Sequence, residues 1–204
     1  MKTSIAIKIT HTLSNPSKMP GWSYGLPALE CKTGSKLRKV PGTPCYGCYA
    51  LKGCYSFPDV KKAQYKRLRA LAREPWTAAM AALINSKKSK WFRWHDSGDV
   101  QDLDHLNKIF KVCRLTPDTR HWLPTREAWT MDHVSRAPDN LIIRFSMPMV
   151  NQEPAGSWLT IGMENLIVKF LGARDTWSLV HASRVGSQCL VSGVNLQTSK
   201  ILFR

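Results

Sequence analysis

The apolar side chains of this 204-residue chain recur with the period of a strand in some segments and of a helix in others. Alternating or short apolar runs between turns predict strands over residues 1–10, 91–95, 120–125 and 141–146. Helical spacing predicts helices over residues 59–73, 77–85, 102–114 and 127–135. Strands that alternate with helices of this length indicate βα units and a parallel sheet. We therefore predict an α/β fold, either an open parallel sheet or a partial, incomplete parallel β/α barrel.

The stretch from His11 to Pro44 has neither period. Proline and glycine punctuate it, as at Asn15-Pro16, Pro20-Gly21 and Pro41-Gly42, and predict turns. So long a loop is uncommon in a compact domain unless it is functional or is held in place. We expect a long N-terminal loop that contains cysteines and is ordered by a bound metal.

The chain divides into two predicted segments. Residues 1–154 are expected to form the α/β domain, and residues 155–204 a separate C-terminal segment. No run approaches 18 consecutive apolar residues, so we expect no transmembrane helix. The first residues lack the apolar stretch and the cleavage site of a secretory signal, which predicts a cytoplasmic protein.

The charge balance favours a polyanionic partner. Thirty Lys and Arg against 14 Asp and Glu give a net charge of +16, and neutralising phosphates with such charges releases counterions. We expect a nucleic-acid partner, although charge of this kind also serves solubility alone. Several large aromatic residues are either core residues or platforms for nucleobases, namely Trp91, Phe92, Trp94, Trp122 and Trp129.

Three of the six cysteines, Cys31, Cys45 and Cys48, lie in or just after the irregular stretch, and Cys54 follows six residues later. Cytosolic thiols stay reduced, so clustered cysteines indicate a metal site or catalysis more often than disulfides. The two-residue gap between Cys45 and Cys48 lets two thiolates face one centre. Three ligands and an open position suit a reactive iron–sulfur cluster, whereas four cysteines suit a closed structural zinc site. The spacing leaves both open.

The basic residues around these cysteines predict lowered thiol pKa values, because a positive field favours the thiolate. They are Lys32, Lys36, Arg38, Lys39 and Lys52. The isolated Cys113, in contrast, lies in an amphipathic stretch and is predicted to be a helix core residue.

Function in parallel α/β folds collects at the carboxyl ends of the strands. The strand predicted over 91–95 leads into a polar turn, formed by His95, Asp96, Ser97, Gly98 and Asp99. Two carboxylates and an imidazole can perform general acid–base work or hold a cationic group, so His95, Asp96 and Asp99 are candidate catalytic residues. The turn can equally serve as the cap of the next helix, through Asp99 or Asp102.

A second turn of this kind follows the strand predicted over 120–125. There Arg126 can bind a phosphate or carboxylate group, or pair with Glu127 instead. We expect the cysteines and both turns to meet at one edge of the sheet.

Four blocks of sequence stand out in chain order. They are Cys-Lys-Thr-Gly-Ser-Lys (31–36), Pro-Gly-Thr-Pro-Cys-Tyr-Gly-Cys-Tyr-Ala (41–50), Arg-Trp-His-Asp-Ser-Gly-Asp (93–99) and His-Trp-Leu-Pro-Thr-Arg-Glu (121–127). Together they resemble the mycobacteriophage gene product 88 family, over roughly residues 15–150. The resemblance implies a phage or mobile-element protein that works in the host cytoplasm. Beyond about residue 155 only Cys189 corresponds to a further cysteine-rich block of the family, which implies a divergent or truncated C-terminal segment over 155–204.

The layout is more distantly similar to phage gene products 37/68 and, through them, to radical S-adenosylmethionine enzymes. That resemblance implies a [4Fe–4S] cluster on Cys31, Cys45 and Cys48, with Ser97-Gly98-Asp99 in the place of a cofactor-binding Gly-Gly-Glu turn. The chain departs from the pattern in its first gap, which has thirteen residues instead of three. The run Asp96–Gln101 is also similar to the Asp-Ser-Gly-Gly-Phe-Gln turn of guanine transglycosylases, which implies Asp96 as general base and structural zinc on the cysteines.

We therefore predict a metal- or iron–sulfur-dependent enzyme that modifies nucleic acid, with radical S-adenosylmethionine chemistry as one hypothesis. Two alternatives stay open: a zinc-stapled nucleic-acid-binding protein without catalysis, and a guanine-transglycosylase-like base-exchange enzyme. The predicted metal ligands are Cys31, Cys45, Cys48 and Cys54. The predicted cofactor- or substrate-binding residues are Ser97, Gly98 and Arg126.

Overall fold

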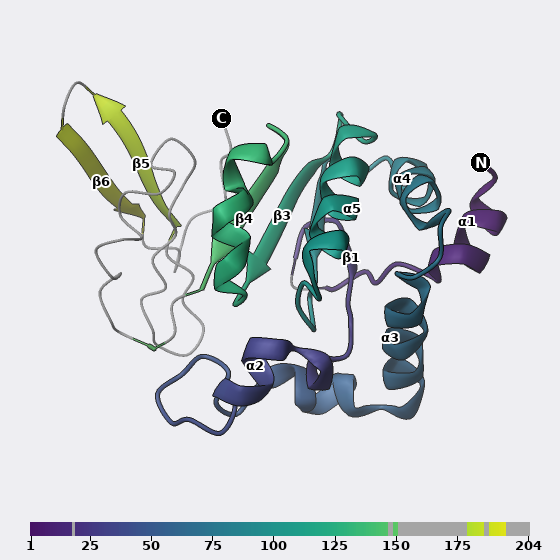
Figure 1. Cartoon of the computed structure of the whole chain (residues 1–204), viewed down its shortest axis with the longest axis horizontal. Helices are drawn as coiled ribbons and strands as arrows, with labels where there is room; N and C mark the ends of the chain where they lie inside the picture. Colours follow the sequence, from purple (N-terminus) through teal and green to yellow (C-terminus); the bar gives the residue numbers. More distant parts are fainter. Residues whose placement is uncertain (18, 147–148, 151–178, 186–187, 195–204) are drawn as a thin grey trace.

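The protein contains a parallel sheet of four strands in chain order, β1-β2-β3-β4 (Figure 1). The structure is a computed structural model and describes residues 1–17, 19–146, 149–150, 179–185 and 188–194. The four strands are β1 (Trp22–Tyr24), β2 (Trp91–Trp94), β3 (Arg120–Thr125) and β4 (Leu141–Phe145). The predicted α/β class and parallel sheet are confirmed. Within the described residues the sheet is open, with β1 and β4 at its edges, so the predicted barrel is not seen.

Helices and a hairpin complete the described elements. The α-helices are α1 (Thr3–Thr10), α2 (Lys32–Leu37), α3 (Pro58–Ala70), α4 (Trp76–Ser86) and α5 (Leu103–Arg114). Short 3₁₀ helices are η1 (Ala28–Glu30), η2 (Tyr49–Leu51), η3 (Gly53–Ser56) and η4 (Ala128–Arg136). The antiparallel strands β5 (Leu179–Val185) and β6 (Gln188–Val194) lie within the predicted C-terminal segment, most of which is outside the described residues. No helix of the described part is long and apolar enough to cross a membrane.

The strand predicted over residues 1–10 is wrong, because this segment is helix α1. Its isoleucines alternate as in a strand, yet the buried residues are Ala6 and Thr10, four positions apart on one helical face. Ile5, by contrast, is 48% exposed. Tertiary packing of this small-residue face, mainly against α4, outweighs the local alternation.

The stretch from His11 to Pro44 is less irregular than predicted, since it contains β1, η1 and α2. β1 has only three residues and gives too short a pattern to identify. It follows Gly21, which has a φ of +82°, and a Cβ there would overlap the carbonyl oxygen of Trp91. The cysteines therefore lie on turns and short helices between β1 and α3, and not in one long loop.

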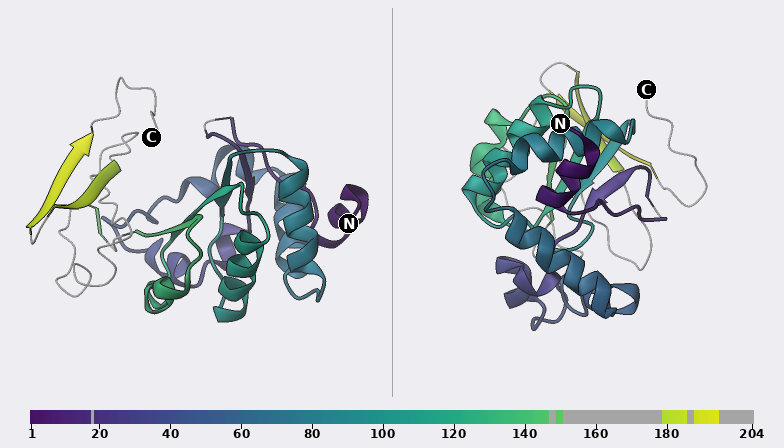
Figure 2. Two further views of the ribbon diagram at one scale, coloured as in Figure 1. Left: turned by 90° about the horizontal axis from the view of Figure 1, so that it is seen from above. Right: turned by 90° about the vertical axis from the view of Figure 1, so that its right-hand side faces the viewer.

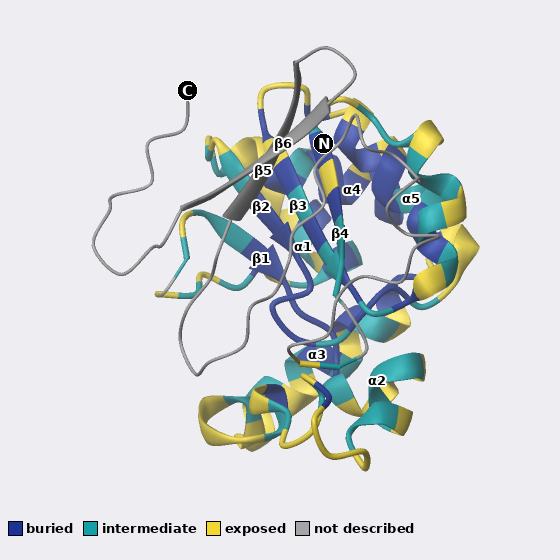
Figure 3. Ribbon diagram, turned by 90° about the vertical axis from the view of Figure 1, so that its left-hand side faces the viewer, coloured by how far each residue is buried: buried dark blue, intermediate teal, exposed yellow. Residues whose placement is uncertain are grey.

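One face of the sheet forms the hydrophobic core together with α4 and α5 (Figure 3). Tyr24, Trp94 and Leu123 project from successive strands into this core and are fully buried. Trp76 of α4 packs edge-on against Tyr24, with ring centroids 5.8 Å apart. Cys113 is buried in this core, as predicted for a helix core residue.

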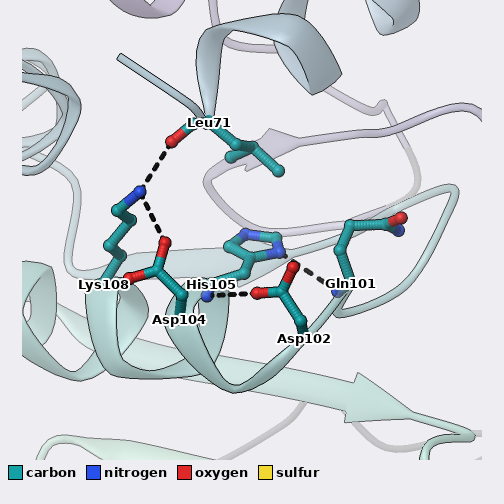
Figure 4. A network of polar contacts seen from close by, with 6 residues as sticks. All are labelled: Leu71, Gln101, Asp102, Asp104, His105 and Lys108. Carbon is teal, nitrogen blue, oxygen red and sulfur yellow. Dashed lines mark hydrogen bonds and ion pairs between the residues drawn. The ribbon is translucent and has the colours of Figure 1, made fainter. Parts of the chain in front are cut away.

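Helix α5 starts directly after the acidic turn and is capped by Asp102, not by Asp99 (Figure 4). The Asp102 carboxylate accepts the backbone N–H of His105 at 2.8 Å. Lys108 pairs with Asp104 at 2.7 Å and donates to the carbonyl oxygen of Leu71 at 2.8 Å, which ties α5 to the chain just after α3. Because Asp102 provides the cap, the carboxylates of Asp96 and Asp99 are left for other contacts.

The segment between β1 and α3 forms a layer next to the carboxyl ends of the strands (Figures 1 and 2). In Figure 1 the arrowhead of β3 points toward this layer, which contains α2 and the cysteines. The polar turns that follow β2 and β3 thus lie at the edge where the cysteine layer meets the sheet.

Candidate active site at the carboxyl edge of the sheet

Asp96 joins three segments of the chain at the end of β2. The side chain is 6% exposed, and its Oδ1 accepts the hydroxyl of Ser23 in β1 at 2.5 Å. Its Oδ2 accepts the hydroxyl of Tyr55 from the cysteine layer at 3.1 Å. Gly25 makes room for this carboxylate, since a Cβ at that position would lie 2.5 Å from Oδ1. Tyr49 adds a hydrogen bond of 2.5 Å from its hydroxyl to the Asp96 carbonyl oxygen.

Ser97 and Gly98 hold the turn against the extension of β1. The Ser97 hydroxyl donates to the carbonyl oxygen of Leu26 at 2.6 Å and accepts the Gln64 side-chain amide at 2.8 Å. Gly98 has a φ of +80°, and a Cβ there would lie 2.6 Å from the Cβ of Leu26. The serine and the glycine therefore fix the shape of the turn.

Asp99 connects the turn after β2 to the turn after β3. Its Oδ1 accepts the backbone N–H of Val100 and the hydroxyl of Thr125, both at 2.7 Å. Its Oδ2 accepts the backbone N–H of Arg126 at 2.8 Å. Burial raises the pKa of Asp99 to about 6, with a smaller contribution from Glu127, while the hydrogen bonds act in the opposite direction. Burial thus favours the neutral form of the Asp99 carboxyl group, and its hydrogen bonds favour the charged form.

His95 lies on the core side of the same turn. Its Nδ1 is 3.2 Å from the carbonyl oxygen of Tyr24, and its ring centroid is 5.2 Å from that of His105. Burial lowers the pKa of His95 well below its usual value, so the imidazole is neutral. Its ring contacts are with Trp94 and His105, and none with the carboxylates of Asp96 or Asp99 is found among the described residues. The contact of His95 with the Tyr24 carbonyl oxygen suits a residue that positions the turn after β2.

The predicted ligands Cys31, Cys45 and Cys48 lie close together in the structure. The sulfurs of Cys31 and Cys45 lie 3.8 Å and 3.6 Å from the place that a Cβ of Gly34 would occupy. These two distances limit the separation of the two sulfurs to 7.4 Å. The Cys48 thiol is close enough to interact electrostatically with both, and so is the carboxylate of Asp99. All three cysteines are half-buried.

Cys54 is separate from this group. It is exposed on η3, and it is not among the charged neighbours of Cys31 or Cys45 in the described part of the chain. Both Cys54 and the three clustered cysteines are free thiols. No group of three or more His, Cys, Asp or Glu residues within it is arranged to hold a single metal ion. A four-cysteine zinc site is therefore not preformed.

The expected lowering of the thiol pKa values is wrong for Cys31 and Cys45. Burial is the largest effect and raises the pKa of both Cys31 and Cys45. Asp99 and the neighbouring thiols raise them further, and the main group acting against this at Cys45 is Arg126. The lysines of the segment project from a layer with much solvent exposure, where their field is screened.

Arg126 faces the cysteines and β4. Its guanidinium donates to the thiol of Cys45 and, through Nη1, to the carbonyl oxygen of Ser146 at 2.8 Å. Its backbone N–H binds Asp99, as described above. The partners of this side chain thus include a thiol and a carbonyl group.

Glu127 is a site residue that the sequence did not identify. Its carboxylate is 3% exposed and accepts both the backbone N–H and the hydroxyl of Thr33, each at 2.8 Å. Thr33 lies two residues after Cys31, so this bidentate contact fastens the cysteine layer to the end of β3. The position of Glu127 after a strand was a signal for it, but its partner is 94 residues away in the chain. The sequence did not identify Ser23, Tyr49 and Tyr55 either, because each lies 41 to 73 residues from its partner Asp96.

Comparisons with known proteins identify a family. Neither the curated proteins nor the solved structures contain a significant match to this chain. A protein-family model described as gene product 88 matches residues 2–170, a longer range than the 15–150 expected from the sequence blocks. The match covers most of the 204 residues. The chain therefore belongs to the gene product 88 family.

Proposed function

We propose that this protein is an iron–sulfur enzyme that modifies nucleic acid, with a [4Fe–4S] cluster on Cys31, Cys45 and Cys48 and S-adenosylmethionine at the adjacent turn. One observation carries the proposal. Half-buried thiols from separate parts of the chain gather at the carboxyl edge of a parallel sheet, with two sulfurs at most 7.4 Å apart and Asp99 beside them.

The donor set fits such a centre. Ionised thiols are the ligands of iron–sulfur clusters, and three of them leave a position open. Burial, Asp99 and the Cys48 thiol raise the pKa of both Cys31 and Cys45, which disfavours their thiolate forms. A bound cationic centre would offset this cost of ionising the thiols. A single zinc ion needs ligand atoms about 2.3 Å from one point. Cys54 is exposed and apart from the other three, so the donor set fits a cluster with three ligands better than a closed four-cysteine zinc site.

The residues around the cysteines would bind the cofactor, accept a proton or position the site. Cys31, Cys45 and Cys48 would hold the cluster, which would supply one electron for radical chemistry. Asp99 has three hydrogen bonds and one acceptor position left, which suits an ammonium group of the cofactor. Asp96 is the candidate proton acceptor, since two hydroxyl groups bind its carboxylate within the described part of the chain and leave acceptor positions open. Arg126 holds Cys45, and His95 positions the turn through the Tyr24 carbonyl group.

The strand order also supports a partial β/α barrel as part of this proposal. Adjacent parallel strands in chain order, with connecting helices on one face, are the arrangement of such barrels. Strands beyond β4 would have to come from residues outside those described.

Metal analysis after anaerobic purification tests the proposal. We expect about four irons and as many sulfides per chain, as for one [4Fe–4S] cluster. Cys31→Ala, Cys45→Ala and Cys48→Ala should each lose most of the iron, whereas the matched variant Cys54→Ala should retain it. One zinc per chain, lost also in Cys54→Ala, would instead identify the zinc-stapled binding protein. Guanine exchange into nucleic acid that Asp96→Asn abolishes, in a protein without iron, would identify the transglycosylase-like enzyme.

A further inference from the structure

The face of the sheet opposite the core carries arginine and tryptophan side chains. Alternation along the strands places Phe92 and Trp94 in the core and the residue between them, Arg93, on the other face. Arg93 is in register with Trp122 of β3. Arg144 of β4 lies on the same face, because its neighbour Ile143 is buried in the core.

The two arginines flank the same indole ring. The guanidinium carbon of Arg93 is 4.8 Å from the ring centroid of Trp122, and that of Arg144 is 5.7 Å from it. Both distances are within the range of cation–π attraction. The indole therefore fixes two planar guanidinium groups on adjacent strands.

These guanidinium groups lack acidic partners in the described part of the chain. The ion pair found there joins Lys108 and Asp104, far from this face. The Nε atoms of Arg93 and Arg144 are buried and have no hydrogen-bond partner among the described residues. Burial lowers the pKa of Arg144 to about 10, and no acidic group of the described residues acts against this effect. Arg93 is buried and Arg144 is half-buried, and neither has a counter-ion among the described residues. An anionic ligand would remove the desolvation cost of such charges.

Arg93 also links this face to the candidate active site. Its Nη1 donates to the sulfur of Met19 at 2.7 Å, and its guanidinium hydrogen-bonds to the hydroxyl of Tyr49. The same hydroxyl donates to the Asp96 carbonyl oxygen, and Tyr49 directly follows Cys48. A ligand on the arginines therefore lies next to the turn and the cysteines.

We propose that Arg93 and Arg144, held by Trp122, bind phosphate groups of a single-stranded nucleic acid that lies across this face and leads to the Asp96 turn. Planar guanidinium forks match phosphate oxygens, and the net charge of +16 attracts a polyanion. A flexible single strand can reach arginines that do not protrude from a sheet, whereas the phosphates of a rigid duplex meet mainly protruding side chains. The inference rests on the proposed function in taking nucleic acid as the substrate of that site.

Equilibrium binding of a labelled single-stranded oligonucleotide to the full chain tests this inference. At moderate salt, Arg144→Gln should weaken binding about tenfold, as for the loss of a charge-assisted hydrogen-bonded contact. The slope of log K against log salt concentration should fall in magnitude by about 0.7, the value for one phosphate contact with a single strand. Arg144→Lys should also weaken binding, because it keeps the charge and loses the fork.

The matched control is Arg114→Gln, an equal charge change at an exposed position of α5 on the core side of the sheet. It should bind the oligonucleotide like the unmodified protein. Equal losses for Arg114→Gln and Arg144→Gln, with unchanged melting temperatures, would overturn the inference, because binding would then be diffuse. Equal affinity for duplex, or full competition by inorganic phosphate at matched ionic strength, would also overturn it.

A failure of the binding face can be distinguished from a failure of the proposed iron–sulfur centre. Iron content and oligonucleotide affinity are measured on the same samples of unmodified and Arg144→Gln protein. Selective binding by a protein that never contains iron would refute the cluster and leave the binding face intact. Iron with normal stoichiometry but no effect of Arg144→Gln on binding would refute the binding face alone.

Discussion

At the scale of single residues, the protein buries many polar groups and satisfies most of them with specific partners. The carboxylates of Asp96, Asp99 and Glu127 are each at most 6% exposed, and each accepts two or three hydrogen bonds. Buried groups of this kind are stable only with their partners in place, which makes the site sensitive to small changes. The buried histidines and the glycine of the turn allow the sharpest tests.

We expect acid to unfold the protein through its buried histidines. Burial lowers the pKa of His105 to about 3 and that of His121 to about 4, so the folded protein keeps both neutral. The unfolded chain takes up protons below its ordinary histidine pKa of about 6.5. The stability is therefore fully present above pH 6.5 and falls with pH toward the folded pKa values, by about 1.4 kcal/mol per pH unit for each histidine.

Urea unfolding at pH 7, 6 and 5 measures this dependence. His105→Gln should reduce the slope of the unfolding free energy against pH by the share of one histidine. His133→Gln, on η4 with a half-exposed ring, is the control and should leave the slope unchanged. A slope unaffected by His105→Gln would show that this imidazole is already protonated in the folded protein.

Gly98→Ala should destabilise the protein by more than about 3 kcal/mol, because both φ and close packing exclude a Cβ. The backbone has a φ of +80°, and the new atom would lie 2.6–2.8 Å from atoms of Leu26. Gly53→Ala is a matched control, with a φ of +55° and nothing within 4 Å, and should cost only about 1 kcal/mol. Equal costs in thermal or urea unfolding would show that contact with Leu26 does not constrain the turn.

At the scale of elements, the cysteine layer is connected to the sheet by a few long-range contacts. The bidentate contact between Glu127 and Thr33 and the hydroxyl of Tyr55 on Asp96 hold it at the strand ends. The 3₁₀ helices and turns of this layer have few buried residues of their own. Its order therefore depends on these polar contacts, and in our proposal also on the metal centre.

Glu127→Gln should loosen the cysteine layer without unfolding the core. It removes the negative charge and one acceptor oxygen, so both charge-assisted hydrogen bonds from Thr33 are lost or weakened, which costs about 2 kcal/mol. Limited trypsin digestion should cut faster at Lys32 and Lys36, on either side of Thr33. In a double-mutant cycle with Thr33→Val the two effects should be less than additive.

Glu74→Gln, the same substitution at an exposed position, should change neither the digestion nor the stability. Strict additivity of Glu127→Gln and Thr33→Val would show that these two residues do not act together.

At the scale of the whole molecule, a basic chain presents a parallel sheet whose two faces differ in chemistry. One face forms the apolar core with α4 and α5, and the other carries Arg93, Trp122 and Arg144. The cysteine layer lies at the edge where both faces end. This arrangement brings the proposed metal centre, the acidic turn and the proposed nucleic-acid surface together.

Removal of the metal centre should lower the stability of the whole protein. A ligand that binds the folded state alone raises the melting temperature, so anaerobically purified protein should melt several degrees above the chelator-treated form. Cys48→Ala protein should melt like the treated form, with or without chelator. Identical melting curves for untreated and treated protein would contradict a centre that holds the cysteine layer in place.

Much of the sheet and its turns could be predicted from local patterns. The segments that form β2, α5, β3 and β4 have clear periods and turn residues, so their order and parallel arrangement follow. The same patterns located Asp96, Asp99 and Arg126, because polar residues after parallel strands meet at one edge. The family was also indicated by four short blocks of sequence, and the match over residues 2–170 confirms it.

Tertiary structure alone decided the remaining features, since they depend on contacts between distant segments. Helix α1 forms because Ala6 and Thr10 pack against α4, although its isoleucines alternate as in a strand. The partners of Asp96 and Glu127 lie 73 and 94 residues away in the chain. Residue type and spacing thus determined which groups have reactive chemistry, whereas packing determined which of them are buried, paired or close to one another.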